Sequence, residues 1–248
     1  MDTTDTKYWA IVPAAGIGSR VGADIPKQYI SIHHKTILEH TLGKLLDCKL
    51  FSGIIVAISS EDNYFQDLPL SKHKDITTVY GGADRCDSVL AALDYLTTIT
   101  DGNDWVLVHD AARPCVTIND IHSMVEQLKG HPVGGILGIP VRDTMKRLST
   151  NEIAESETKE IEKTECRENM WHALTPQMFR LETLHKALIH CRNQNLVVTD
   201  ESSAIEQSGM KPAIIEGSAS NIKVTQADDL QLAEFYLKQQ EQESKNEL

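Results

Sequence analysis

Two cations and a run of small residues lie close together near the start of the sequence. The segment 13–29, PAAGIGSRVGADIPKQY, contains Arg20 and Lys27 and follows the short apolar run at 9–12. A strand that ends in a glycine-rich loop brings backbone N–H groups close to a ligand, and such groups bind phosphates. Arginine and lysine are needed in addition where negative charge builds up during a reaction, as when pyrophosphate leaves. The segment therefore favours a nucleoside triphosphate site over a structural turn.

The glycine spacing matches neither of two familiar phosphate-binding loops. A Walker loop ends in Gly-Lys-Ser or Gly-Lys-Thr, and the sequence contains no such run. A dinucleotide fingerprint has the pattern G-x-G-x-x-G, whereas Gly16 and Gly18 are followed by Gly22, one position late. Helix-end amides suffice to hold a dinucleotide pyrophosphate, so dinucleotide binding would not explain the presence of Arg20 and Lys27. A dinucleotide-dependent oxidoreductase is therefore the more distant alternative.

A carboxylate follows a second apolar run. Asp110 comes just after residues 105–108, which are expected to form a buried strand. Mg²⁺ prefers oxygen ligands and usually takes one or two carboxylates together with substrate phosphates. Asp110 is therefore the candidate ligand for a triphosphate-bound Mg²⁺, although an Asp here can also cap a turn or a helix. His109 is expected to be structural, because one His beside one Asp does not make a zinc site.

A reaction between a nucleoside triphosphate and a phosphomonoester needs positive charge rather than a general base. The second pKa of a phosphomonoester is about 6, so its oxygens are already ionised at neutral pH. Catalysis then consists of positioning and of neutralising the charge that develops. Arg20 and Lys27 suit the triphosphate. For the phosphate of the acceptor the sequence offers Arg113, Arg142, Lys146, Arg147, Arg167 and Lys223.

Alternating strands and helices predict how these residues are positioned. The expected strands are 9–12, 54–58, 76–80, 105–108, 133–139 and 213–215, and the expected helices are 36–46, 88–96, 118–128, 180–191, a short one after 199–201 and a last one ending near 237. This order is typical of an α/β fold, here a single Rossmann-like domain with a mostly parallel sheet flanked by helices. The glycine-rich loop, Gly81-Gly82 and Asp110 all follow strands, so we expect them at one edge of the sheet, where ligands bind.

Two polar segments do not fit this alternation. The segment 149–168 is rich in glutamate, and the residues leave open a disordered loop, a solvated helix or a protruding arm. Thr225-x-x-Asp228 resembles a capping box that opens the last helix, and the polar tail 238–248 is expected to be frayed. No second domain boundary is evident, so we expect one domain over residues 1–248 with an arm near 149–168.

Composition excludes several classes of protein. Of the 248 residues 41% are hydrophobic and 24% are charged, which is ordinary for a globular protein. The net charge of −12 argues against a nucleic-acid binder. We expect no membrane span, signal peptide or transit peptide, because the apolar runs are short and the N-terminus is polar. The 5 cysteines lack C-x-x-C spacing and are expected to be reduced thiols of a cytoplasmic protein.

Several motifs resemble one family of nucleotidyltransferases. PAAGxGxR at 13–20 and PKQY at 26–29 are similar to the signature of enzymes that make sugar and polyol nucleotides, most closely the 2-C-methyl-D-erythritol 4-phosphate cytidylyltransferases of the non-mevalonate isoprenoid pathway. The family's later motifs resemble HDAARP at 109–114, VRDTMK at 141–146, WHALTPQ at 171–177, TDE at 199–201 and NIKVT at 221–225. The resemblance covers nearly the whole chain and implies transfer of CMP from CTP to methylerythritol phosphate, giving 4-diphosphocytidyl-2-C-methyl-D-erythritol and pyrophosphate. A cytidylyltransferase for another polyol phosphate, such as ribitol 5-phosphate, and a non-enzymatic nucleotide-binding module remain alternatives.

The resemblance also implies roles for individual residues. Arg20 and Lys27 resemble the transition-state stabilisers. The implied CTP contacts are Ala14, Ala15, Gly16, Gly82, Ser88 and Asp110, with Asp110 also at the Mg²⁺ ion. The implied acceptor contacts are Arg113, Thr144, Arg167, Thr175 and Lys223. In the family the polar insertion is an arm that embraces a second subunit, which implies a homodimer. Ala83 and Ser220 depart from the family's pattern, which commonly has Asp at both positions.

Overall fold

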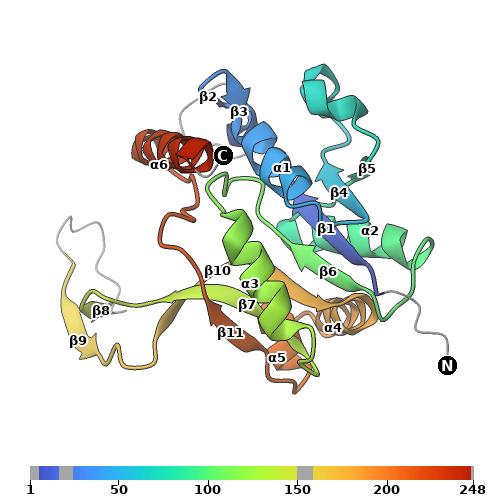
Figure 1. The fold of residues 1–248 in the computed structure, drawn as a ribbon. Helices are drawn as coiled ribbons and strands as arrows, with labels where there is room; N and C mark the ends of the chain where they lie inside the picture. Colours follow the sequence, from blue (N-terminus) through green and yellow to red (C-terminus); the bar gives the residue numbers. More distant parts are fainter. Residues whose placement is uncertain (1–5, 17–24, 150–158, 247–248) are drawn as a thin grey trace.

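The central element of the fold is a seven-stranded sheet with the order β11-β7-β10-β6-β1-β4-β5. The computed structural model describes residues 6–16, 25–149 and 159–246 (Figure 1). The strands are β1 (Tyr8–Pro13), β4 (Gly53–Ile58), β5 (Ile76–Tyr80), β6 (Trp105–Val108), β7 (Gly134–Pro140), β10 (Trp171–Arg180) and β11 (Ala213–Glu216). Only β10 runs antiparallel to its neighbours β6 and β7. The expected mostly parallel sheet is confirmed, but β10 was not predicted.

Helices cover both faces of the sheet. Helices α1 (Ile37–Asp47) and α3 (Ile118–Leu128) pack on one face, and α2 (Arg85–Thr97), α4 (Leu181–Asn193) and α5 (Glu201–Gln207) pack on the other (Figure 1). Side chains along β1 alternate between the two faces of the sheet, so both faces are apolar and need a cover of helices. Ala10 and Val12 join the core under α1, while Ile11 joins the core under α2. All three side chains are fully buried. The Rossmann-like arrangement therefore follows from strands that are apolar on both faces.

Local capping decides where two of these helices begin. Thr36 caps α1 through a capping box with Glu39, in agreement with the expected start of that helix. The expected start of α2 at residue 88 is wrong, since the helix begins at Arg85. The reason is Asp84, whose side chain accepts a hydrogen bond from the backbone of Asp87 and caps the helix three residues earlier. This difference places Arg85 on a rigid element beside the expected site.

The last helix, α6 (Ala227–Asn246), is longer than expected. Ala233 and Leu237 are buried, and the side chain of Gln240 donates to the backbone carbonyl of Cys115 at 2.9 Å. The prediction of a frayed tail at 238–248 is therefore wrong for the described residues, because this face of the helix stays docked one turn past Leu237. The carboxylate that accepts hydrogen bonds from the residues before the helix is Asp229, which binds the backbone and hydroxyl of Thr225 and the backbone of Gln226, and not Asp228 as expected.

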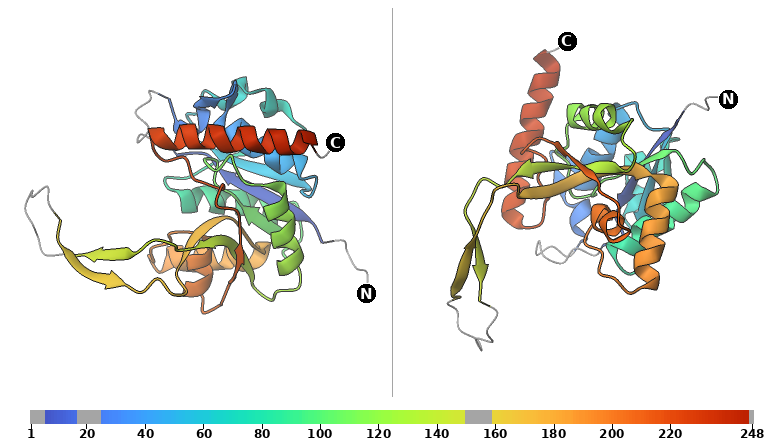
Figure 2. Two further views of the ribbon diagram at one scale, coloured as in Figure 1. Left: turned by 60° about the vertical axis from the view of Figure 1, so that its left-hand side comes forward. Right: turned by 90° about the horizontal axis from the view of Figure 1, so that it is seen from below.

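The polar insertion forms part of an arm. Strands β8 (Met145–Leu148) and β9 (Ile161–Glu165) pair antiparallel in a ribbon of their own. Figure 2 shows this ribbon extending away from the body of the molecule. Of the three alternatives for 149–168, the arm is the one observed, and its first strand begins before residue 149. Residues 150–158 lie outside the described part of the chain.

The remaining elements are short. They are the strands β2 (Ser31–Ile32) and β3 (Lys35–Thr36) and the 3-10 helices η2 (Lys27–Tyr29), η3 (Phe65–Asp67) and η4 (Pro69–Lys72). Over the described ranges, none of the helices has the length and apolar character needed to cross a lipid bilayer.

Candidate active site

The carboxyl ends of β1, β5 and β6 meet at one pocket of about 190 Å³. Eight residues proposed from the sequence line it: Ala14, Ala15, Gly16, Lys27, Gly82, Ser88, Asp110 and Lys223. The other lining residues are Pro13, Gln28, Ala83, Asp84, Arg85, Ala111 and Ala112. The prediction that segments distant in sequence share one edge of the sheet therefore holds for the described residues.

Gln28 holds the start of the glycine-rich loop in place. Its side-chain amide donates to the carbonyls of Ala14 at 2.7 Å and Gly16 at 3.0 Å, and the residue is almost fully buried. The neighbouring Lys27 donates from Nζ to the carbonyl of Val224 at 3.1 Å. The short helix η2 thus ties the loop after β1 to the segment before α6. Arg20, the second expected transition-state stabiliser, lies outside the described residues.

Two glycines have different reasons to be glycine. A Cβ on Gly81 would lie 2.6 Å from the Ser88 hydroxyl and 2.7 Å from the Ala15 Cβ, so packing of the two loops requires glycine there. A Cβ on Gly16 would have no described atom of the protein within 4 Å. Packing against the described residues therefore gives no reason for glycine at 16, whereas close approach of a ligand to the backbone would give one.

Asp110 lies among three cations. Its Oδ1 accepts from Nε of Arg85 at 2.9 Å, its Oδ2 lies 2.8 Å from Nζ of Lys223, and the same Oδ2 lies 3.5 Å from Nε of Arg113. Burial by itself raises the pKa of Asp110, but Arg85, Lys223 and Arg113 outweigh burial and hold the pKa far below its usual value. Asp110 is therefore ionised at neutral pH.

Arg85 is a site residue that the sequence interpretation missed. Besides Asp110 it contacts Glu201, which is 1% exposed, through two hydrogen bonds of 2.7 and 3.0 Å. Burial lowers the pKa of Arg85, but the two carboxylates outweigh burial and raise it, so the guanidinium stays charged. The sequence features that could have pointed to this contact are an arginine three residues after Gly82 and the glutamate of the TDE motif.

Two of the expected acceptor contacts lie behind Asp110 rather than on the wall of the pocket. Thr175 is buried, and its hydroxyl accepts from the backbone N–H of Asp110 at 3.1 Å. Arg113 is 8% exposed and donates from Nη1 to the carbonyl of Asn221 at 2.7 Å. His109 contacts the Thr175 hydroxyl and the Arg113 carbonyl, and burial lowers its pKa to about 4. A neutral, buried His109 fits the expectation that it is structural.

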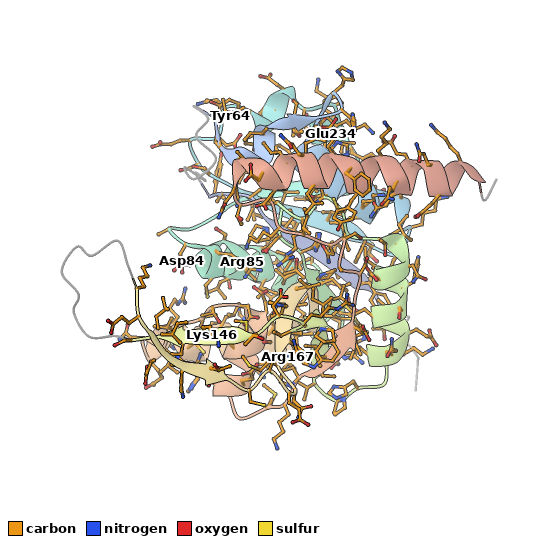
Figure 3. All side chains as sticks on the ribbon, turned by 90° about the vertical axis from the view of Figure 1, so that its left-hand side faces the viewer. Tyr64, Asp84, Arg85, Lys146, Arg167 and Glu234 are labelled. Carbon is orange, nitrogen blue, oxygen red and sulfur yellow. The ribbon has the colours of Figure 1, made fainter. Side chains whose placement is uncertain are left out.

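Two more of the five expected acceptor contacts lie apart from the pocket of this chain, whereas the fifth, Lys223, lines it. Thr144 and Arg167 are exposed at the base of the arm, and neither lines the pocket. Arg167 donates to the backbone carbonyl of Arg142. In Figure 3 Asp84 and Arg85 lie on the body, Lys146 lies on a strand of the arm, and Arg167 lies where the arm joins the body.

The chemistry of Asp110 fits a Mg²⁺ ligand, provided that the Lys223 side chain can move away from it. Its carboxylate faces a pocket that has room for phosphate oxygens, and one or two carboxylates are usual for phosphate-bound Mg²⁺. In the described part of the chain, no cluster of three or more His, Cys, Asp or Glu could hold a metal without substrate. Lys223 is 39% exposed and occupies Oδ2, so this side chain has to move before that oxygen can accept a metal.

Comparison with known proteins agrees with this geometry. The family model for 2-C-methyl-D-erythritol 4-phosphate cytidylyltransferase matches residues 8–239. The cytidylyltransferase of that name from Vibrio vulnificus (strain YJ016) is 51% identical over 232 residues, which cover 94% of this chain and 95% of that protein. The one from Vibrio cholerae is 49% identical over 235 residues, which cover 95% of this chain and 98% of that protein.

Solved structures show the same similarity. A crystal structure of the Francisella tularensis 2-C-methyl-D-erythritol 4-phosphate cytidylyltransferase superposes with a TM-score of 0.78 at 40% identity, covering 93% of this chain and 100% of that one. A crystal structure of a 4-diphosphocytidyl-2C-methyl-D-erythritol synthase gives a TM-score of 0.80 at 33% identity, covering 94% of this chain and 99% of that one. The resemblance seen in the motifs is confirmed, and the chain belongs to the 2-C-methyl-D-erythritol 4-phosphate cytidylyltransferase family.

Proposed function

We propose that this chain transfers CMP from CTP to 2-C-methyl-D-erythritol 4-phosphate, releasing pyrophosphate, as a step in the synthesis of isoprenoid precursors. The observation that carries the proposal is the pocket itself. It combines a glycine-rich loop, Lys27 and the pair of Asp110 and Lys223 at the carboxyl edge of the sheet. A family member with this set of groups has what phosphate chemistry needs, namely positive charge and close backbone approach.

The residues of the chain have separate tasks in this proposal. The loop at Ala14–Gly16, held by Gln28, receives CTP. An oxygen of the acceptor phosphate attacks the α-phosphorus, the bond to the bridging oxygen of the β-phosphate breaks, and pyrophosphate leaves. Lys27 stabilises the negative charge that develops on the phosphates, together with Arg20. Lys223 supplies positive charge for the phosphate of the acceptor from the wall of the pocket, and the buried Arg113 adds positive charge from behind Asp110.

Mg²⁺ is part of the proposal through Asp110. Oδ2 of Asp110 would hold the ion once Lys223 has moved to the acceptor phosphate, because Oδ1 is engaged by Arg85. A bound Mg²⁺ supplies positive charge that neutralises the triphosphate. In this proposal Lys223 therefore binds Asp110 in the free protein and binds the phosphate of the acceptor in the complex.

We further propose that the protein acts as a homodimer in which the arm of one copy completes the site of the other. Thr144 and Arg167 stand apart from the pocket of their own chain, so contact with the acceptor requires the arm of a second copy. The arm region also exposes apolar side chains, including Ile161 at 59% and Trp171 at 36%. Exposed apolar surface on a protruding ribbon is typical of an interaction site.

Mixing two inactive variants tests the shared site. If Lys27 and Arg167 act from different subunits, a dimer of one Lys27→Ala chain and one Arg167→Ala chain contains one intact site. An equal mixture should then recover about a quarter of the wild-type activity, since half of the dimers are mixed. If both residues act in one subunit, every site of the mixture is defective and no activity returns.

The function itself is tested by its product. Isotope-labelled CTP incubated with methylerythritol phosphate and Mg²⁺ should yield a cytidine diphosphate ester of the polyol, identified by mass spectrometry. CTP, and not NAD, should raise the melting temperature of the protein. A shift with NAD alone would favour the oxidoreductase alternative. A cytoplasmic location is proposed together with this activity, and the five unpaired cysteines agree with it.

A further inference from the structure

Arg85 joins two acidic side chains that are far apart in the sequence. Its two terminal nitrogens donate to the two oxygens of Glu201, and its Nε donates to Oδ1 of Asp110 at 2.9 Å. Glu201 lies 116 residues further along the chain. Because the guanidinium is planar and its N–H groups have fixed directions, these contacts couple the orientation of Asp110 to the position of Glu201.

Glu201 is itself held firmly. It is the first residue of α5, whose cap Asp200 accepts from the backbone of Ser203. Gln177 of β10 donates to the Asp200 side chain at 2.9 Å and accepts from the backbone of Ser202 at 2.9 Å. The first turn of α5 is therefore fixed to the sheet. Arg85 consequently has a rigid anchor on the side away from Asp110.

The two oxygens of Asp110 have unequal surroundings. Oδ1 is bound to Arg85, whose other nitrogens are committed to the buried Glu201. Oδ2 faces Lys223, a side chain that is 39% exposed and can exchange with a ligand, and it lies 3.5 Å from Nε of the buried Arg113. A carboxylate with one oxygen held by a planar guanidinium cannot rotate freely, so the direction of its second oxygen is set as well.

We propose that Arg85, anchored by Glu201, is a positioning residue that orients Asp110 so that Oδ2 is presented to the triphosphate and its metal. This inference rests on the role of Asp110 in the proposed function. Stability alone explains the arrangement poorly, because buried ion pairs are often no more stabilising than apolar packing of the same volume. Groups that orient a metal ligand through hydrogen bonds, in contrast, typically change metal affinity or activity by about 10–100-fold when removed.

Two variants separate orientation from packing. Arg85→Lys keeps the charge but loses the forked geometry, and Glu201→Gln keeps the size of the anchor but loses its charge. Each should raise the Mg²⁺ concentration needed for half-maximal turnover and lower kcat by about 10–100-fold, with a smaller change in KM for CTP. Glu201→Gln provides the same test if Arg85→Lys fails to fold.

A double variant shows whether Arg85 acts through Asp110. In an Asp110→Asn background, Arg85→Lys should lower kcat by no more than about twofold, because effects on one shared group do not add. Leu188→Ala is the control, since Leu188 is buried in α4 away from the pocket and its loss lowers stability without touching Asp110. An equal loss from Arg85→Lys in both backgrounds, or a loss of stability alone as in the control, would overturn the proposal.

A binding measurement keeps this test independent of the reaction. Isothermal titration calorimetry of CTP at increasing Mg²⁺, without acceptor, should show weaker Mg²⁺ dependence in Arg85→Lys and Glu201→Gln than in the wild type. If the wild type transfers CMP to no acceptor, the proposed function fails, but the calorimetric comparison still decides the role of Arg85. Identical Mg²⁺ dependence in all three proteins would refute it.

Discussion

Replacing Asp110 by asparagine removes the one negative charge that faces three cations. Arg85 retains Glu201 as a partner, and Lys223 is 39% exposed and can turn to solvent. Among the described residues, Arg113, whose side chain is 10% exposed, then keeps its contact with the Asn221 carbonyl but has no carboxylate partner, so its charge is uncompensated there. Breaking a buried ion pair costs about 3–5 kcal/mol. With one strongly buried charge left unpaired, we expect a loss of about 3 kcal/mol in the free energy of unfolding.

Thermal unfolding at several pH values measures this loss. For a chain of 248 residues, about 3 kcal/mol corresponds to a fall in Tm of about 6–12 °C at pH 7. The surrounding cations hold the pKa of Asp110 in the folded protein below its unfolded value of about 3.9. The stabilisation is therefore fully present above that value and is lost as the pH falls below it. The gap between wild type and variant should stay constant from about pH 6 to 8 and narrow below about pH 5.

The control is a second Asp→Asn change, made away from the pocket. Asp94 on α2 pairs with His185 at the surface and has a side chain that is 60% exposed, so Asp94→Asn should cost less than about 1 kcal/mol. Equal Tm values for Asp110→Asn and wild type at pH 7, or a gap that stays the same in acid, would refute the assigned electrostatics.

Three further substitutions probe the loop and the reaction. Lys27→Ala should leave CTP binding by calorimetry nearly intact but lower kcat by about 100-fold or more, and an unchanged kcat would exclude it from catalysis. Gln28→Ala frees two carbonyls of the glycine-rich loop, so KM for CTP should rise by about tenfold while kcat changes less; a wild-type KM would show that Gln28 is not needed to order the loop. Gly81→Ala forces a Cβ to within 2.6 Å of Ser88 and should destabilise the protein by about 1–3 kcal/mol in denaturant unfolding, whereas Gly16→Ala, which meets no described atom, should change stability by less than about 1 kcal/mol.

Much of the sheet could be predicted because its strands are apolar on both faces. Residues 54–58 are all buried in β4, so a continuous apolar run was a reliable signal. β10 was missed because its first residues are exposed and its pairing with β7 is interrupted by an irregularity between Ala173 and Gln177. The strands of the arm were missed because most of their residues are exposed and polar, which gives no periodic apolar signal.

The site was predictable where it consists of neighbours in sequence. The loop after β1 and the position of Asp110 follow from strand ends, whereas the contact between Arg85 and Glu201 joins two helix starts 116 residues apart. No local pattern encodes such a pairing. The expected start of α2 at residue 88 also left Arg85 in a loop, where a fixed orientation of its side chain was not anticipated.

The measurement that tests the central claim most directly is pyrophosphate release from CTP and Mg²⁺ by the wild-type protein. Methylerythritol phosphate and ribitol 5-phosphate are offered separately, and Lys27→Ala is assayed alongside. Our account predicts release with methylerythritol phosphate, little with ribitol 5-phosphate, and a large loss in the variant. Release with ribitol 5-phosphate alone would contradict the acceptor, and no release with either, from folded protein that binds CTP, would contradict the proposed reaction.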